Sequence, residues 1–259
     1  MDLFLGNKKV LVSGSSKGIG RSIAENFLLE GAQVMITGRS ENSLNEAYEY
    51  FSKRYSNRGV FKYCGDLTET NEIGECLEYV SEVFERLDIL ILNIGVSKFK
   101  PGLEADISEW ERMFKNNFWG SVNLFYQSLP LLRRGVDASV VFISSIAGNE
   151  NIGAPIPYAA AKGALTIAAQ SFAKVVASDN VRVNVIAPGN VIFPGGRWEE
   201  ITAEKPEMVR ELLEEKVPQR RFASPQEIAD LVLFVSSKRA SFITGSVVTI
   251  DGGQTRHYL

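Results

Sequence analysis

Two residues whose types could do acid–base chemistry, Tyr158 and Lys162, stand four positions apart in the chain. We predict a helix over residues 158–178, and side chains four apart on a helix lie on the same face. A free tyrosine has a pKa of about 10 and is a poor base at neutral pH. An ammonium about 4 Å away, at an effective dielectric of about 20, contributes roughly 4 kcal/mol, or about 3 pK units. We therefore expect Lys162 to bring the pKa of Tyr158 into a range useful for general acid–base catalysis, although this spacing also occurs by chance.

Serine hydroxyls occur at the end of a predicted strand upstream of the tyrosine. The apolar run 140–143 indicates a buried strand, and Ser144 and Ser145 follow it directly, Ser145 lying thirteen residues before Tyr158. In α/β folds the ligand binds at the carboxyl ends of the strands. We therefore expect a serine hydroxyl at the edge of the sheet where chemistry takes place.

A glycine-rich turn lies near the N-terminus. Residues 13–20 read Ser-Gly-Ser-Ser-Lys-Gly-Ile-Gly, directly after the apolar run 10–12 and at the start of a predicted helix. Glycines here allow a tight turn and let backbone N–H groups approach a pyrophosphate at the positive end of the helix. The spacing of Gly14, Gly18 and Gly20 departs from the strict G-x-G-x-x-G fingerprint, so a plain tight turn is the alternative interpretation.

The end of the second predicted strand bears on the choice of dinucleotide. NAD sites place an acidic residue there to bind the ribose hydroxyls, whereas residues 36–40 read Ile-Thr-Gly-Arg-Ser and contain no acid. Arg39 instead offers a planar guanidinium suited to a 2′-phosphate, and Lys17 in the glycine turn could add a second charge. The alternative is a solvated surface cation. We therefore expect NADP(H) to be preferred, with NAD(H) possible.

The elements that must position these residues alternate between short apolar runs and longer amphipathic stretches. We expect strands over residues 10–12, 33–37, 60–63, 89–92, 140–143, 181–186 and 247–250. We expect helices over residues 19–30, 41–55, 70–85, from about 108 onward, 158–178, 206–216 and 225–235. Apolar strands separated by helices predict a parallel sheet covered on both faces. Residues 1–259 are therefore expected to form a single α/β domain, a doubly wound, Rossmann-like and mostly parallel sheet of about seven strands with helices on both faces.

Composition narrows the function further. Hydrophobic residues make up 45% of the 259 residues and charged residues 23%, and the net charge of -3 argues against a general nucleic-acid binder. No apolar run approaches the roughly 18 residues that span a bilayer, and the first residues lack a signal-peptide core. Cys64 and Cys76 are too few for a disulfide framework, so we expect free thiols and a cytoplasmic location. Because His257 is the only histidine, we expect neither a histidine-based metal site nor a Ser-His-Asp triad.

The motifs together resemble those of the short-chain dehydrogenase/reductase family, in its single-domain form of about 250 residues. The resemblance runs from about residue 8 to residue 253 and rests on the order and spacing of several short signals. These are the glycine turn, Asp66-Leu67, Asn93-x-Gly95, Asn117 in an Asn-x-x-Gly stretch, the Ser…Tyr-x-x-x-Lys pattern of Ser145, Tyr158 and Lys162, Pro188-Gly189, and Thr244-Gly245 with Asp251-Gly252-Gly253.

The resemblance implies a role for each matching residue. Tyr158 would exchange a proton with the substrate oxygen, and Ser145 would hydrogen-bond that oxygen. Lys162 would lower the pKa of the phenol and hold the nicotinamide ribose, while Asn117 would bind a water that links Lys162 to solvent. The expected cofactor-binding residues are Gly14, Ser16, Lys17, Gly18, Ile19, Arg39, Asp66, Leu67, Asn93, Gly95, Tyr158, Lys162, Pro188, Gly189 and Val191.

Three positions beside the expected cofactor depart from the family pattern. Leu92 replaces a usual Asn, Ile94 a usual Ala, and Phe193 stands where a Thr often contacts the carboxamide. Residues 190–216, which contain Gly195, Gly196 and Trp198, would form the substrate loop, and the glycines could hinge a lid. An ordinary surface loop is the alternative there.

Residues and resemblance together predict an NADP(H)-dependent oxidoreductase that transfers a hydride between the nicotinamide and a ketone or secondary alcohol on a small substrate. An NAD-linked alcohol or sugar dehydrogenase, a β-ketoacyl carrier-protein reductase and a nucleotide sensor without turnover remain alternatives. Relatives that receive a carrier protein tend to have arginines near the mouth of the site. This chain has Val136 and Asp179 there, although Arg133 and Arg134 lie close by in the sequence. The resemblance also implies a homotetramer.

Overall fold

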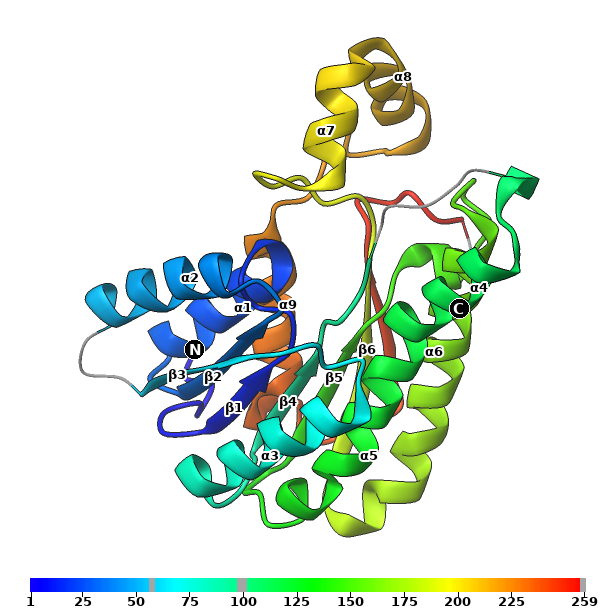
Figure 1. The fold of residues 1–259 in the computed structure, drawn as a ribbon. Helices are drawn as coiled ribbons and strands as arrows, with labels where there is room; N and C mark the ends of the chain where they lie inside the picture. The colour runs from blue at the N-terminus through cyan, green and yellow to red at the C-terminus, as the bar shows by residue number, and fades with distance from the viewer. Residues whose placement is uncertain (56–58, 97–101, 257–259) are drawn as a thin grey trace.

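Seven parallel strands form one sheet in the order β3-β2-β1-β4-β5-β6-β7 (Figure 1). The computed structural model describes residues 1–55, 59–96 and 102–256. The strands are β1 (Lys9–Val12), β2 (Gln33–Gly38), β3 (Val60–Cys64), β4 (Ile89–Leu92), β5 (Ser139–Ile143), β6 (Arg182–Pro188) and β7 (Val247–Ile250). The uninterrupted apolar runs predicted strands buried on both faces, and all neighbouring strands of the sheet pair in parallel. The sheet is thus wholly rather than mostly parallel.

Helices cover both faces of the sheet. They are α1 (Gly18–Leu29), α2 (Glu41–Arg54), α3 (Thr70–Phe84), α4 (Ile107–Phe114), α5 (Gly120–Leu132), α6 (Ile156–Val176), α7 (Arg197–Glu204), α8 (Pro206–Lys216) and α9 (Pro225–Ser236). Helices α1, α2 and α9 pack on one face, and α3, α5 and α6 on the other (Figure 1). None of these helices has the length and apolar character needed to cross a lipid bilayer.

The alternation of side chains along each strand builds two separate cores. Val10 and Val12 of β1 are fully buried in the core that contains Phe27 of α1, whereas Leu11 is buried in the opposite core with Phe125 of α5. Neighbouring strand residues point to opposite faces, and both faces meet apolar helix surfaces. The predicted doubly wound fold is confirmed.

Two segments differ from their predicted form. The long helix expected from about residue 108 is interrupted by a π-helical segment, Lys115–Trp119, between α4 and α5. Such a widened turn often marks a functional site, and this one carries Asn117. Helix α7 was not predicted, because the stretch before residue 206 is rich in Gly, Pro and Glu and no side chain caps the helix at its start.

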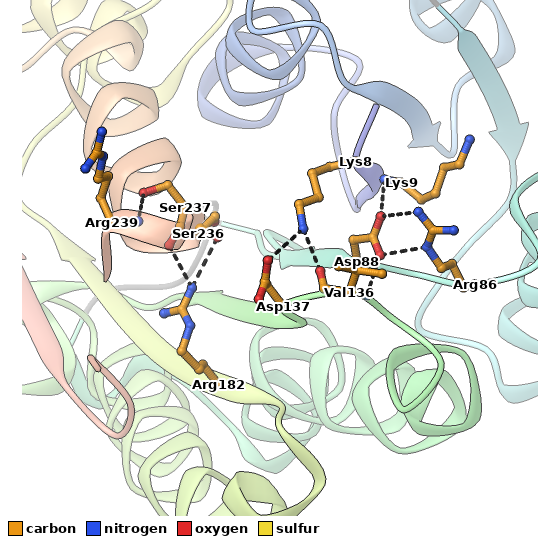
Figure 2. Close-up of polar contacts among 10 residues, drawn as sticks. All are labelled: Lys8, Lys9, Arg86, Asp88, Val136, Asp137, Arg182, Ser236, Ser237 and Arg239. Atoms are coloured by element: carbon orange, nitrogen blue, oxygen red, sulfur yellow. Dashed lines mark hydrogen bonds and ion pairs between the residues drawn. The ribbon is translucent and has the colours of Figure 1, made fainter. Parts of the chain in front are cut away.

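The amino edge of the sheet holds a buried carboxylate. Asp88, which directly precedes β4, is fully buried and accepts hydrogen bonds from the backbone N–H groups of Lys9 (2.9 Å) and Val136 (2.7 Å). The Arg86 guanidinium donates to both of its oxygens, at 2.9 and 3.5 Å (Figure 2). Asp88 thus ties β1, β4 and the turn before β5 together.

A partly buried arginine, two strands away at the same edge, also binds several backbone groups. Arg182, at the start of β6, donates to the carbonyl groups of Val235, Ser236, Ser237 and Ile243 at 3.0–3.2 Å. Figure 2 shows its contacts with Ser236 and Ser237. Carbonyl groups at the end of a helix lack intrahelical partners, so the guanidinium satisfies those at the end of α9. The amino edge is therefore a place where buried charges are fully used by the fold.

Candidate active site

A cavity of about 730 Å³ lies at the carboxyl edge of the sheet. Parallel strands all end there, and the strand order reverses between β1 and β4, which is where ligands of doubly wound folds bind. The predicted site residues that line it are Gly14, Ser16, Lys17, Ile19, Arg39, Asp66, Leu67, Asn93, Gly95, Asn117, Ser145, Tyr158, Lys162, Pro188, Gly189 and Val191. The cavity therefore gathers residues from eight separate stretches of the chain; Gly18 is the one predicted site residue outside its lining.

The glycine turn forms one wall as a close-packed cradle. Gly14 and Gly18 adopt positive φ angles of 62° and 57°, which side chains rarely tolerate. A Cβ on Gly20 would lie 2.3 Å from the carbonyl oxygen of Gly14. Helix α1 begins at Gly18, and no side chain caps its first turn, so its N–H groups are available for an anion. The cradle fits the pyrophosphate of a dinucleotide.

Phe193 explains why Gly18 does not line the cavity. A Cβ on Gly18 would lie 2.7 Å from two carbons of the Phe193 ring, and one on Gly196 would lie 3.0 Å from the same ring. The ring therefore covers this glycine and links the dinucleotide cradle to the start of α7. Phe193, one of the three positions that depart from the family pattern, thus forms part of the wall of the cradle.

The opposite end of the cradle carries Arg39, directly after β2. Its guanidinium lies 3.6 Å from the Asp66 carboxylate, and its side chain is 58% exposed. Asp66 is held in turn by the backbone N–H and the hydroxyl of Thr68, at 3.0 and 2.8 Å. Because one exposed ion pair uses only part of the donor capacity of a guanidinium, Arg39 can still bind a phosphate. The residues thus fit the 2′-phosphate of NADP(H).

The two serines that follow β5 have different surroundings. Ser144 is buried, and its hydroxyl lies 3.1 Å from the carbonyl of Lys162 and 2.8 Å from the hydroxyl of Thr166, both on α6. Ser145 is partly exposed, lines the cavity and hydrogen-bonds with the side chain of Tyr158. Ser144 therefore anchors α6 to the sheet, and Ser145 is the hydroxyl available to a substrate.

Lys162 is a buried cation whose nearest described acceptor is a carbonyl group. Its Nζ donates to the carbonyl oxygen of Ile143 at 2.9 Å, and Lys162 is 5% exposed. A Cβ on Gly95 would lie 3.6 Å from this Nζ and 3.0 Å from Oδ1 of Asn117, which itself accepts from the N–H of Val96 at 3.2 Å. A side chain at position 95 would therefore crowd the Asn117 amide, so glycine suits the close approach of the turn after β4 to this residue.

The expected lowering of the tyrosine pKa is wrong as a net effect. Burial raises the pKa of Tyr158, and the hydrogen bond with Ser145 lowers it by less. Burial also lowers the pKa of Lys162 to about 8. Both shifts have one cause, since a low-dielectric environment disfavours the charged form of each group. Tyr158 is thus kept as a neutral phenol.

The sequence identified the residues at the far end of the cavity only in part. The expected substrate loop, residues 190–216, supplies Arg197, Trp198, Ile201 and Leu212, whereas Val96, Ile152, Ile156 and Gln254 were not singled out. The spacing of three residues between Trp198 and Ile201 is the signal in the sequence that could have predicted α7 as an amphipathic helix. Among the described residues, no group of three or more His, Cys, Asp or Glu side chains could hold a metal ion, and His257 lies outside those residues.

Known proteins resemble the chain over nearly its whole length. Residues 14–255 match the family model described as enoyl-(acyl carrier protein) reductase. A 3-oxoacyl-[acyl-carrier-protein] reductase of Aquifex aeolicus is 33% identical over 98% of this chain and 99% of that protein, and a tropinone reductase homolog of Arabidopsis thaliana is 34% identical over 94% and 88%. The structure of L-sorbose reductase from Gluconobacter frateurii, complexed with NADPH and L-sorbose, superposes with a TM-score of 0.93 at 29% identity, covering 99% of this chain and 100% of that one. The chain therefore belongs to the short-chain dehydrogenase/reductase family and is an NAD(P)-dependent oxidoreductase of that family.

Proposed function

We propose that this oxidoreductase reduces a ketone on a small substrate to a secondary alcohol with NADPH, and that Tyr158 supplies the proton. One observation carries the proposal: a single cavity connects the dinucleotide cradle to Ser145, Tyr158 and Lys162. A bound nicotinamide supplies the hydride, so the chain has only to orient the carbonyl group and provide the proton.

The protonation of Tyr158 supports its role as proton donor. A general acid must carry its proton at the operating pH, and burial raises the pKa of this phenol. Ser145 hydrogen-bonds with the phenol, and in this proposal it holds the same carbonyl oxygen. As that oxygen gains negative charge, the proton moves to it from the Tyr158 hydroxyl while Ser145 stabilises the charge.

Lys162 and Asn117 act around this proton transfer. The ammonium of Lys162 uses one donor on Ile143, and its remaining donors suit the ribose hydroxyls of the cofactor. Asn117 is fully buried and fixes Val96, so it holds the turn that carries Gly95 against the cavity. We propose that these two residues position the cofactor and connect the proton donor to solvent.

Arg39 supports NADP(H) over NAD(H). No acid stands at the end of β2 to accept from the ribose hydroxyls, and the exposed Arg39 guanidinium lines the cavity together with Ser16 and Lys17. The complex of L-sorbose reductase with NADPH is consistent with this choice. Comparable affinities for NADPH and NADH would instead favour the alternative, an NAD-linked dehydrogenase.

A carrier-protein substrate is favoured by one relative, the 3-oxoacyl-[acyl-carrier-protein] reductase. Against it, the structure places Val136 and the Arg133–Asp179 pair (2.8 Å) at the amino edge of the sheet, and none of these residues lines the cavity, so the expectation that they lie at the mouth of the site is wrong. The deciding experiment measures NADPH and NADH oxidation with simple ketones, sugar ketones and β-ketoacyl thioesters. Turnover of ketones with NADPH supports the proposal, turnover of thioesters alone supports the carrier-protein reading, and NADPH binding without any turnover supports a sensor.

We further propose that the protein assembles as a homotetramer. Helices α5 and α6 expose Tyr126, Ile167 and Val175, and Trp119 is exposed just before α5. Apolar side chains gathered on one pair of helices are typical of a surface that packs against a second copy, and two-fold symmetry is the usual arrangement. A monomer mass by light scattering at micromolar concentration would contradict the proposal.

A further inference from the structure

The far wall of the cavity is chemically unlike the cradle. The charged side chains that line the cavity among the described residues are Lys17, Arg39, Asp66, Lys162 and Arg197. The first three belong to the cradle and the fourth to the proton-transfer group. On the wall beyond Tyr158 only Arg197 is charged, and it is already paired with Glu200 on its own helix at 3.3 Å. The wall that meets the substrate therefore carries little charge, and apart from the uncharged amides of Asn116, Asn190 and Gln254 its side chains are mainly hydrocarbon.

Two separate parts of the chain supply this hydrocarbon. Ile152 and Ile156 line the cavity from the segment that joins Ser145 to Tyr158. Trp198, Ile201 and Leu212 come from α7 and α8, which we call the lid helices. Because two segments distant in the sequence both contribute apolar side chains, the apolar character belongs to the cavity and not to one stretch of the chain.

The lid helices have almost no core of their own. No residue of α7 is buried, and Val209 is the only buried residue of α8. In Figure 1 the two helices stand apart from the sheet and its covering helices, above the carboxyl edge. Trp198 lies 5.0 Å from Phe222, centroid to centroid, yet remains partly exposed, as do Ile201 and Leu212. These side chains therefore have apolar surface that a ligand in the cavity could bury.

We infer that the substrate is a ketone whose carbonyl is flanked by hydrocarbon groups, and that Ile201 and Trp198 of α7 select for them. The inference rests on the proposed function and narrows its substrate class. A polyhydroxylated ketone would lose hydrogen bonds to water against this wall, whereas an alkyl or cyclic ketone gains from leaving water. The chain thus differs in substrate class from the L-sorbose reductase that it resembles in fold.

A chain-length series tests the inference. With NADPH and the methyl ketones from butanone to octanone, kcat/KM should rise roughly fourfold for each methylene until the cavity is full. The kcat/KM for octanone should also exceed the values for L-sorbose and dihydroxyacetone. A chain-length dependence that is flat, or a higher kcat/KM for the hydroxylated ketones, would overturn the inference while leaving the proposed reduction in place.

Matched variants of the lid helices distinguish the loss of an apolar side chain from the cavity wall from the effect of any apolar-to-polar substitution on these helices. Ile201→Ser should flatten the chain-length dependence to less than twofold per methylene with an unchanged Kd for NADPH. Met208→Ser is the control, because Met208 is an exposed apolar residue of α8 that does not line the cavity. It should keep the wild-type dependence. Equal effects of the two substitutions, or none from Ile201→Ser, would count against the inference.

Binding without turnover distinguishes failure of the inference from failure of the proposed function. Calorimetry with NADPH-loaded Tyr158→Phe enzyme should show octanone binding more tightly than butanone. If the ketones bind in this order but wild-type enzyme reduces none of them, the proposed function fails, while the selection of hydrocarbon groups by Ile201 and Trp198 stands. If no hydrocarbon ketone binds, the inference fails whatever else the enzyme reduces.

Discussion

At the amino edge of the sheet the buried carboxylate of Asp88 accepts four hydrogen bonds from three residues, whereas at the carboxyl edge the buried ammonium of Lys162 donates to a single carbonyl group. Both charges lie next to the ends of central strands. The first is fully used by the fold, and the second keeps donor capacity for a ligand. Burying a charge costs free energy unless it is compensated, so the carboxyl edge gives up stability that the amino edge secures.

The hydrogen-bonding groups at the two edges of the sheet differ in the same way. Arg182 satisfies carbonyl groups at the end of α9, which a folded chain must satisfy in any case. At the other edge the first turn of α1 has no side-chain cap, and Arg39 remains exposed. We therefore expect substitutions at the amino edge to lower stability and substitutions at the carboxyl edge to lower binding and turnover.

The largest expected effect is on turnover at the carboxyl edge. Tyr158→Phe removes one hydroxyl, so kcat for ketone reduction should fall on the order of 10³-fold, or about 4 kcal/mol in activation free energy, because the proton donor is lost. The Kd for NADPH and the midpoint of thermal unfolding should stay close to wild type. Steady-state kinetics, fluorescence titration and calorimetry measure the three quantities. Retention of wild-type turnover would remove Tyr158 from the mechanism.

The amino edge should show the reverse pattern. Asp88→Ala leaves the N–H groups of Lys9 and Val136 without their acceptor, so the free energy of unfolding should fall by about 3 kcal/mol. Asp137→Ala is the control, since the Lys8–Asp137 pair at 3.3 Å is partly exposed and should contribute less than about 1 kcal/mol. Denaturant titration measures both. Equal losses from the two substitutions would mean that the buried network is not what stabilises this edge.

A buried cation kept for function should leave a signature in pH-dependent stability. The pKa of Lys162 in the folded state is lowered to about 8 from 10.5, so below about pH 8 the burial penalty is fully present. Above it the folded state releases its proton first, and stability rises with pH until the unfolded state also titrates. Between about pH 7.5 and 9.5 this proton release should raise the free energy of unfolding by roughly 2 kcal/mol. The Lys162→Met variant should lack that rise.

Denaturant titrations at several pH values measure this difference. The carbonyl of Ile143 left without a donor costs the variant the same at every pH, so the test lies in the slope rather than in the absolute stability. Lys174→Met, at an exposed position of the same helix, should keep the wild-type slope. Identical slopes for wild type and Lys162→Met would show that the ammonium is not desolvated in the folded protein.

The smallest effect is expected at the exposed end of the cradle. Arg39→Ala should weaken NADPH binding by about tenfold, or about 1.4 kcal/mol, because the 2′-phosphate loses its guanidinium partner. The Kd for NADH, which lacks that phosphate, should hardly change, and Arg39→Asp should shift preference toward NADH. Fluorescence titration with both cofactors checks this. Parallel weakening of NADPH and NADH would mean that Arg39 supports the cradle in general.

The sequence by itself determined the parallel sheet, the glycine turn after β1 and the positions of Ser145, Tyr158 and Lys162. These depend on patterns within short stretches: apolar runs fix buried strands, and a spacing of four fixes one helix face. The break into α4, a π-helical turn and α5 was not predictable in the same way, because the apolar pattern continues through it.

Only the tertiary structure decided which groups are paired and how the site titrates. Ser144 is bound by Thr166, 22 residues away, which leaves Ser145 to the cavity. The net direction of the Tyr158 pKa follows from burial rather than from its helical neighbour. The covering of Gly18 by Phe193 and the apolar wall of the cavity likewise join segments far apart in the chain. Burial and partner geometry depend on such distant contacts, and no local pattern in a single sequence records them.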